Sequence, residues 1–148
     1  MVLQQQANVT FKGYTDANKR VKVTVGWNTK KYAVVADASG YFELTVPTPE
    51  SVAKPYEISF NDGEELLLKN VLIGEVWFCS GQSNMEMPVK GFRGQPVFGT
   101  LKHIVTANPN RKIRLYTVKH AWNTMPKIEG IVGEWKELSG KVVAECSA

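Results

Sequence analysis

A nearly continuous apolar stretch, Val71–Cys79, is the feature that most constrains the fold of this chain of 148 residues. A strand that is buried on both faces of a parallel sheet has this pattern, because both of its alternating sets of side chains are covered. Small and polar residues, Ser80–Asn84, follow directly. Open α/β sheets bind ligands at the carboxyl ends of their strands. The sequence therefore predicts a strand through Val76–Cys79, with Trp77 in the core and Ser83 in a tight turn directly after it.

The residues before this stretch have the pattern of short strands joined by turns. Residues 20–27 place a valine at every second position, as in a half-buried strand. Asp37–Gly40 and Asn61–Gly63 are typical hairpin connections. Strands at this spacing, with no helical period between them, favour a small antiparallel β-sandwich over residues 1–70, without a long helix.

From residue 71 on, the pattern changes to that of an α/β fold. The apolar stretch is followed by a helix candidate at Leu101–Asn108 and a strand candidate at Ile113–Val118, and Lys141–Ala148 has the pattern of the first turns of a helix. Residues 122–138 contain too many Pro and Gly residues to predict a regular element. Alternating strands and helices open an α/β fold. We expect two domains, 1–70 and 71–148, with the second one incomplete.

Composition and charge argue against several classes of function. The chain is 43% hydrophobic and 22% charged, which is typical of a globular domain. Its net charge of +4 comes from scattered basic residues, whereas nucleic-acid binders gather them on one face. No apolar run approaches the roughly 20 residues of a membrane helix. We therefore expect neither a nucleic acid nor a membrane as partner.

The cysteine, metal and targeting signals are sparse. Cys79 and Cys146 are too few for a disulfide framework, and buried or idle thiols are expected. The sequence has no cluster with metal-ligand spacing and no phosphate-binding glycine loop, so we expect no metal and no cofactor. No signal-peptide pattern opens the chain, which leaves its localisation open.

The segment around Ser83 has the chemistry of a nucleophile turn. Gly81 allows a sharp turn and a close approach of the backbone to a substrate. If a helix begins there, its first N–H groups point towards the serine oxygen and stabilise the oxyanion formed when an ester is attacked. Glycine and serine after a strand also fit a purely structural strand-to-helix cap. The residues alone leave both interpretations open.

Several segments resemble the sialate O-acetylesterase family, which are carbohydrate esterases of the SGNH type. The most specific one is Val71–Glu86, which contains Gly-Gln-Ser-Asn-Met at 81–85. Further similar segments are Met1–Gln4, Asp37–Phe42, Ile113–Val118 and Gly133–Trp135. The resemblance implies a β-module followed by an SGNH hydrolase domain that removes acetyl groups from sialic acid or related carbohydrates.

The resemblance also implies roles for particular residues. Ser83 would be the nucleophile and its backbone N–H one oxyanion donor, while Asn84 and Glu86 lie close enough to touch substrate. Glu86 is equally suited to interact with the dipole of a helix that begins there. The family completes its oxyanion hole with a later glycine and asparagine, and its general base is a histidine that closely follows an aspartate. Its members also suggest secretion or a periplasmic location.

The later catalytic parts are not found in this chain. All three aspartates lie within residues 1–70, and neither His103 nor His120 follows an aspartate by three positions. A serine hydroxyl is a poor nucleophile until a base takes its proton. We interpret the chain as an esterase fragment that is inactive alone, with His103 and His120 as surface or structural histidines.

The sequence also fits other interpretations. Trp122 and Trp135 would suit a sugar-facing wall, although packing is the better explanation for both. The whole chain also fits a carbohydrate-binding or structural β-module with a non-catalytic α/β remainder. Exposed sheet edges would favour self-association of the fragment.

Overall fold

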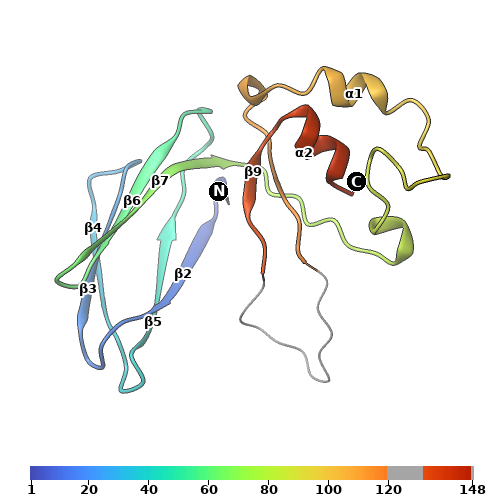
Figure 1. The fold of residues 1–148 in the computed structure, drawn as a ribbon. Helices are drawn as coiled ribbons and strands as arrows, with labels where there is room; N and C mark the ends of the chain where they lie inside the picture. Colours follow the sequence, from blue (N-terminus) through green and yellow to red (C-terminus); the bar gives the residue numbers. More distant parts are fainter. Residues whose placement is uncertain (120–131, 148) are drawn as a thin grey trace. The chain divides into compact units, whose positions relative to one another are not determined.

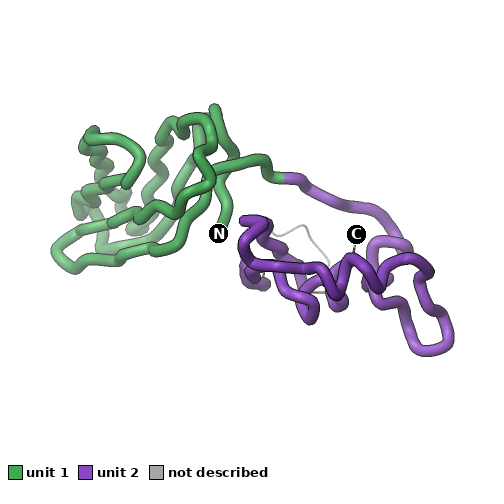
Figure 2. Tube along the Cα trace, turned by 90° about the horizontal axis from the view of Figure 1, so that it is seen from above, with its two compact units in different colours: residues 1–76 green, residues 77–148 purple. Residues whose placement is uncertain are grey.

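The computed structural model describes residues 1–119 and 132–147. The chain divides into two compact units, Met1–Val76 and Trp77–Ala148 (Figure 2). His120 and Trp122 lie outside the described residues.

The amino-terminal unit consists of strands and turns, and it holds no helix. The absence of a long helix, predicted for residues 1–70, is thereby confirmed. Five strands form one sheet in the order β1-β7-β6-β3-β4, and two more form the pair β2-β5 (Figure 1). The strands are β1 (Val2–Gln4), β2 (Asn8–Tyr14), β3 (Arg20–Val25), β4 (Lys31–Val35), β5 (Tyr41–Pro47), β6 (Tyr56–Asn61) and β7 (Glu65–Gly74).

The larger sheet is mixed, because β1 runs parallel to β7 while the other neighbours are antiparallel. The sequence predicted antiparallel pairing throughout, and the β1–β7 pair corrects this. Parallel neighbours need a long connection, and the whole of the unit between Gln4 and Glu65 separates these two strands. Turn signals reveal hairpins but not a pairing of strands so far apart in the sequence.

Both sheets contribute side chains to one apolar core. In β3, Val21, Val23 and Val25 are buried while the residues between them are exposed, as their two-residue period predicted. Phe42 and Val46 of β5 belong to the same buried cluster. Burial of apolar side chains is the main stabilising contribution to such a unit.

The apolar stretch 71–79 does not form one strand. Its first three residues are buried in β7, but the strand ends at Gly74, and Trp77 and Phe78 are 84% and 89% exposed. The predictions of a strand through Val76–Cys79 and of Trp77 in the core were therefore wrong. The physical reason is that β1 ends at Gln4, opposite Gly74, so that beyond this point no described strand runs parallel to β7.

The carboxyl-terminal unit contains short elements. They are the 3-10 turn η1 (Ser83–Met85), α1 (Leu101–Val105), the 3-10 turn η2 (Pro109–Arg111), β8 (Arg114–Tyr116), β9 (Trp135–Glu137) and α2 (Gly140–Glu145). The helices and β8 fall where the sequence predicted helices and a strand, but they are shorter. β9 lies in the segment for which no regular element was expected, and this corrects that expectation.

Close backbone approaches hold this unit together. α1 and α2 are in contact, and a Cβ atom on Gly140 would lie only 2.8 Å from the carbonyl oxygen of Ile104. The hydroxyl of Ser139 accepts a hydrogen bond from the N–H of Val142 and caps α2. Along residues 1–119 and 132–147, no helix has the length and apolar character needed to cross a membrane.

Candidate active site

Ser83 opens the turn η1, at the first position of three residues in 3-10 conformation. The N–H of Met85 donates to the carbonyl oxygen of Gln82 at 2.9 Å, and the N–H of Glu86 donates to that of Ser83 at 3.1 Å. The N–H groups of Ser83 and Asn84 precede the first bonded N–H, as at the start of any helix. Ser83 therefore lies in a tight turn, but eight residues separate it from the end of β7 at Gly74.

The three residues proposed to meet substrate share this turn. Ser83, Asn84 and Glu86 are all exposed. The turn thus presents a serine and two polar neighbours to solvent, and no described histidine is hydrogen-bonded to this serine.

Gly81 is needed for the compactness of this turn. A Cβ atom at this position would lie 2.6 Å from Cγ of Met85, so the methionine folds back over the glycine. The sequence suggested that glycine is needed here for a sharp backbone bend. In the structure it is needed because a side chain at position 81 would collide with Met85, and its φ angle is not unusual. Replacing Gly81 forces Met85 to move and disturbs the residues between them.

The segment after the turn is anchored to the end of α2. Pro88 forms a β-bridge with Ser147, and the N–H of Val89 donates to the carbonyl oxygen of Cys146 at 2.8 Å. Nζ of Lys90 also lies 2.5 Å from a carboxylate oxygen of Glu145. Both side chains of this ion pair are substantially exposed, so the backbone contacts hold the segment more than the charges do.

A small hydrogen-bond network holds the residues that directly follow β7. The carboxylate of Glu75 accepts hydrogen bonds from the side-chain amides of Gln5, at 2.7 Å, and Gln4, at 3.1 Å. These hydrogen bonds lower the pKa of Glu75. The side-chain oxygen of Gln4 in turn accepts the N–H of Val76 at 2.9 Å. Side chains of the first residues thereby replace the strand partner that β7 lacks at this point.

The candidate histidines, tryptophans and cysteines lie outside the turn η1 or outside the described residues. His103 is exposed on α1, and His120 and Trp122 fall in the part of the chain that is not described. Trp135 is half-buried in β9, where its ring packs against that of Tyr116. Packing accounts for Trp135. The earlier expectation of buried or idle thiols holds in part, since both cysteines are free but Cys79 is exposed.

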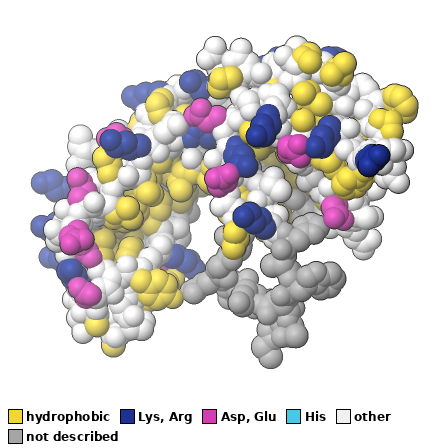
Figure 3. All heavy atoms as spheres, in the orientation of Figure 1, with side chains coloured by type: hydrophobic (Ala, Val, Ile, Leu, Met, Phe, Trp, Pro, Cys, Tyr) yellow, Lys and Arg dark blue, Asp and Glu magenta, His cyan; other side chains and the backbone are white. Residues whose placement is uncertain are grey.

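The described residues contain no group of three or more His, Cys, Asp or Glu side chains suited to a metal ion. On the face drawn in Figure 3, the basic side chains are interspersed with acidic and apolar ones and do not form one continuous patch.

No family model matches the chain. Two curated relatives do match it. The sialate O-acetylesterase of Rattus norvegicus is 28% identical over 149 residues, which cover 93% of this chain and 26% of the relative. The sialate O-acetylesterase of Mus musculus is 29% identical over 128 residues, which cover 80% of this chain and 23% of the relative.

A solved structure is also similar. The crystal structure of a carbohydrate acetylesterase from Xanthomonas citri matches 99% of this chain with a TM-score of 0.85 and 28% sequence identity. The match covers 32% of that protein. The chain thus spans about a quarter of the length of the curated relatives and about a third of the solved structure.

Proposed function

We propose that this chain, which its relatives support as a member of the sialate O-acetylesterase family at modest identity, carries the nucleophile of a carbohydrate O-acetylesterase. The observation that carries the proposal is the rat relative's match to 93% of the chain, which includes the segment around Ser83. The turn η1 supports it, because it presents the hydroxyl of Ser83 to solvent.

The proposed architecture is a β-sandwich followed by the first part of an SGNH-type hydrolase domain. Two sheets that share one core support the first part. The proposed boundary near residue 70 falls within β7 (Glu65–Gly74), and the segment that leads to Ser83 begins after this strand ends. Within this arrangement β7 is the last strand before the proposed catalytic turn.

In the proposed reaction the oxygen of Ser83 attacks the carbonyl carbon of an acetyl group on a sugar hydroxyl. The tetrahedral oxyanion forms beside the start of η1, where the N–H of Ser83 has no acceptor within the turn. The sugar hydroxyl leaves, and water then hydrolyses the acetyl-serine. Asn84 and Glu86 are proposed to touch the sugar, because they share the exposed turn with Ser83.

The proton of Ser83 needs an acceptor, and no histidine among residues 1–119 and 132–147 is hydrogen-bonded to it. All aspartates of the sequence lie at or before Asp62, and no Asp-x-x-His sequence is present. We therefore place the general base outside these 148 residues, and the chain alone is expected to turn over little substrate. The preferred substrate class is O-acetylated sialic acid or a related acetylated carbohydrate.

A fluorophosphonate probe tests the proposal on the longest natural polypeptide that contains this chain. Such probes react with activated serines, and peptide mass spectrometry locates the label. We expect the label on Ser83, and we expect Ser83→Ala to abolish both the labelling and the hydrolysis of acetylated sugars. Ser80→Ala is the matched control, because Ser80 is exposed in the same segment. Labelling that persists in Ser83→Ala would contradict the assignment.

A further inference from the structure

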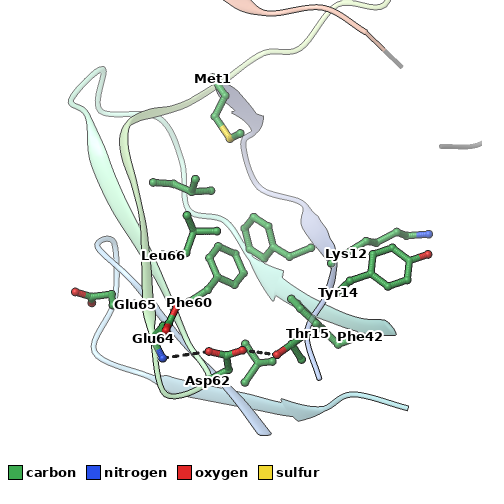
Figure 4. A pocket seen from close by; sticks show the side chains of 14 residues that line it. Met1, Lys12, Tyr14, Thr15, Phe42, Phe60, Asp62, Glu64, Glu65 and Leu66 are labelled. Carbon is green, nitrogen blue, oxygen red and sulfur yellow. Dashed lines mark hydrogen bonds between the residues drawn. The ribbon is translucent and has the colours of Figure 1, made fainter. Parts of the chain in front are cut away.

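The outer face of the β2–β5 pair carries a row of paired side chains. The two strands pair antiparallel along seven residues. One alternating set of side chains faces the core, where Phe42 and Val46 are buried. Figure 4 shows Lys12 and Tyr14 pointing the other way, away from Phe60 on the core side. Three cross-strand pairs of the second set form what we call the outer row: Thr10 with Thr45, Lys12 with Glu43, and Tyr14 with Tyr41.

The polar part of the outer row is fixed by side-chain contacts. The hydroxyl oxygens of Thr10 and Thr45 lie 3.0 Å apart, and Nζ of Lys12 lies 3.4 Å from a carboxylate oxygen of Glu43. The side chains of this ion pair are 56% and 48% exposed, so the pair adds little to stability. An ammonium has three donors and a carboxylate about four acceptor sites. Both groups therefore keep hydrogen-bonding capacity towards a ligand.

The other end of the outer row is aromatic. The rings of Tyr14 and Tyr41 lie 5.5 Å apart, centroid to centroid, at an interplanar angle of 60°. Tyr14 is 63% exposed. The phenol of Tyr41 donates to the carboxylate of Glu43 at 2.9 Å, which joins the aromatic end to the ion pair. The face thus offers an exposed aromatic ring directly beside charged hydrogen-bonding groups.

We propose that the outer row binds a carbohydrate chain. The C–H groups on one side of a pyranose ring pack against an aromatic face, because the π-system of that face is negative. Two neighbouring sugar hydroxyls match the ion pair, since one accepts from Lys12 and the other donates to Glu43. Four residues along a strand extend the row over about 13 Å, which suits a short oligosaccharide. The choice of carbohydrate as ligand class rests on the proposed function, in which sugars carry the acetyl groups.

The charges and polarity of the outer row favour this ligand over other classes. One ammonium beside one carboxylate gives the row no net charge, whereas a nucleic acid binds through an excess of basic groups. The centre of a protein–protein interface is mostly apolar, whereas two of the three pairs here are polar. The same lack of net charge favours an uncharged stretch of a glycan over a negatively charged sugar.

A glycan array of neutral and sialylated oligosaccharides tests for binding by the longest natural polypeptide that contains this chain. The protein carries Ser83→Ala, so that acetyl groups stay in place. We expect retention on neutral oligosaccharides, and isothermal titration with the best of them gives the dissociation constant. A protein that is retained on no oligosaccharide, or on sialylated ones alone, would overturn the inference.

Substitutions in the outer row locate the binding. Tyr14→Ala should raise the dissociation constant by at least about tenfold, as the loss of a central aromatic contact does in other interfaces. Tyr14→Phe keeps the ring and should bind as the wild type does. Lys12→Met keeps the apolar stem without the donors and should also weaken binding. The matched controls are Val35→Ala, 59% exposed on β4, and Lys22→Met, exposed on β3, and both should leave binding unchanged.

Two further measurements separate binding from stability and from catalysis. Urea midpoints identify variants that are folded under the titration conditions, and Lys12→Met remains decisive if Tyr14→Ala is not among them. With Ser83 intact, Tyr14→Ala should leave the hydrolysis of p-nitrophenyl acetate unchanged, because this small ester has no sugar to bind. Failure of the proposed function would abolish that hydrolysis and leave the glycan titration unaffected. Wild-type affinity in Tyr14→Ala or Lys12→Met, or an equal loss in the controls, would overturn the inference.

Discussion

The ring of Tyr116 lies 5.3 Å from the ring of Trp135, centroid to centroid, at an interplanar angle of 57°. The two residues are direct partners in the β8–β9 pair. Gly133 makes room for this arrangement, because a Cβ atom there would lie 2.7 Å from the tyrosine ring. Strand pairing and this aromatic contact thus join the two short strands β8 and β9.

Trp135→Ala should destabilise the carboxyl-terminal unit by about 1–3 kcal/mol, since it removes a half-buried aromatic side chain and its ring partner. Trp77→Ala is the matched control. Trp77 is 84% exposed, and its removal should change the free energy of unfolding by less than about 0.5 kcal/mol. Urea unfolding followed by near-ultraviolet circular dichroism measures both. Equal effects would show that the aromatic contact contributes nothing.

Gly140→Ala should force α1 and α2 apart. The added Cβ would lie 2.8 Å from the carbonyl oxygen of Ile104, and backbone atoms cannot give way as a flexible side chain does. We expect a loss of about 1–3 kcal/mol. At Gly74 a Cβ would meet only atoms at 3.9 Å or more, so Gly74→Ala should be tolerated. Hydrogen exchange of the α2 amides reports the local effect, and unchanged protection in Gly140→Ala would refute it.

The hydrogen bonds of Glu75 predict that the free energy of unfolding depends on pH. The amide of Gln5, and then that of Gln4, hold the pKa of this carboxyl below its ordinary value of 4.5. A group whose pKa is lower in the folded state stabilises the fold above its unfolded pKa, and this contribution is lost as the pH falls through the folded pKa. The contribution of Glu75 is therefore present at neutral pH and disappears below about pH 4.5.

Glu75→Gln should accordingly be less stable than the wild type at pH 7, and the difference should shrink towards zero in strongly acidic solution. Urea midpoints at a series of pH values measure it. Glu50→Gln changes an exposed carboxylate elsewhere in the same unit and controls for the loss of one charge. A difference that persists unchanged at low pH would mean that the amide contacts do not depend on the ionised carboxylate.

Some of this fold was predictable because the relevant signal is local. The burial of Val21, Val23 and Val25 follows from their two-residue period, which needs no knowledge of the rest of the chain. The extent of β7 was not predictable in this way. Val71 and Trp77 belong to one apolar stretch, but only the first is buried, because the available neighbour strand ends at Gln4.

In the candidate site, too, local features were predictable and long-range contacts were not. The tight turn at Ser83 was predicted from small residues next to each other, and the structure contains it. The packing of Met85 over Gly81 and the anchoring of Val89 to Cys146 were not predicted, since they depend on contacts that no local pattern encodes. For the same reason the sequence could not pair Trp135 with Tyr116.

The 148-residue chain alone is predicted to show no substantial esterase turnover. General-base assistance contributes typically about 10²–10⁴-fold to such reactions, and the loss of one oxyanion donor costs on the order of 10²–10³-fold. The described residues bring no histidine into hydrogen-bond contact with Ser83, and the turn offers it the N–H groups of η1 alone. What remains at Ser83 should therefore add little to the uncatalysed rate.

Hydrolysis of p-nitrophenyl acetate by this chain and by the longest natural polypeptide that contains it measures the prediction. The longer protein should turn over the ester, while the chain alone should stay close to the rate of buffer. His103→Ala and His120→Ala in the chain decide whether any residual rate is catalytic. If the chain is active and His120→Ala abolishes that activity, then His120 accepts the proton of Ser83 and the base lies within these residues. If neither histidine variant changes a slow background rate, the result agrees with a base that is supplied from outside these 148 residues.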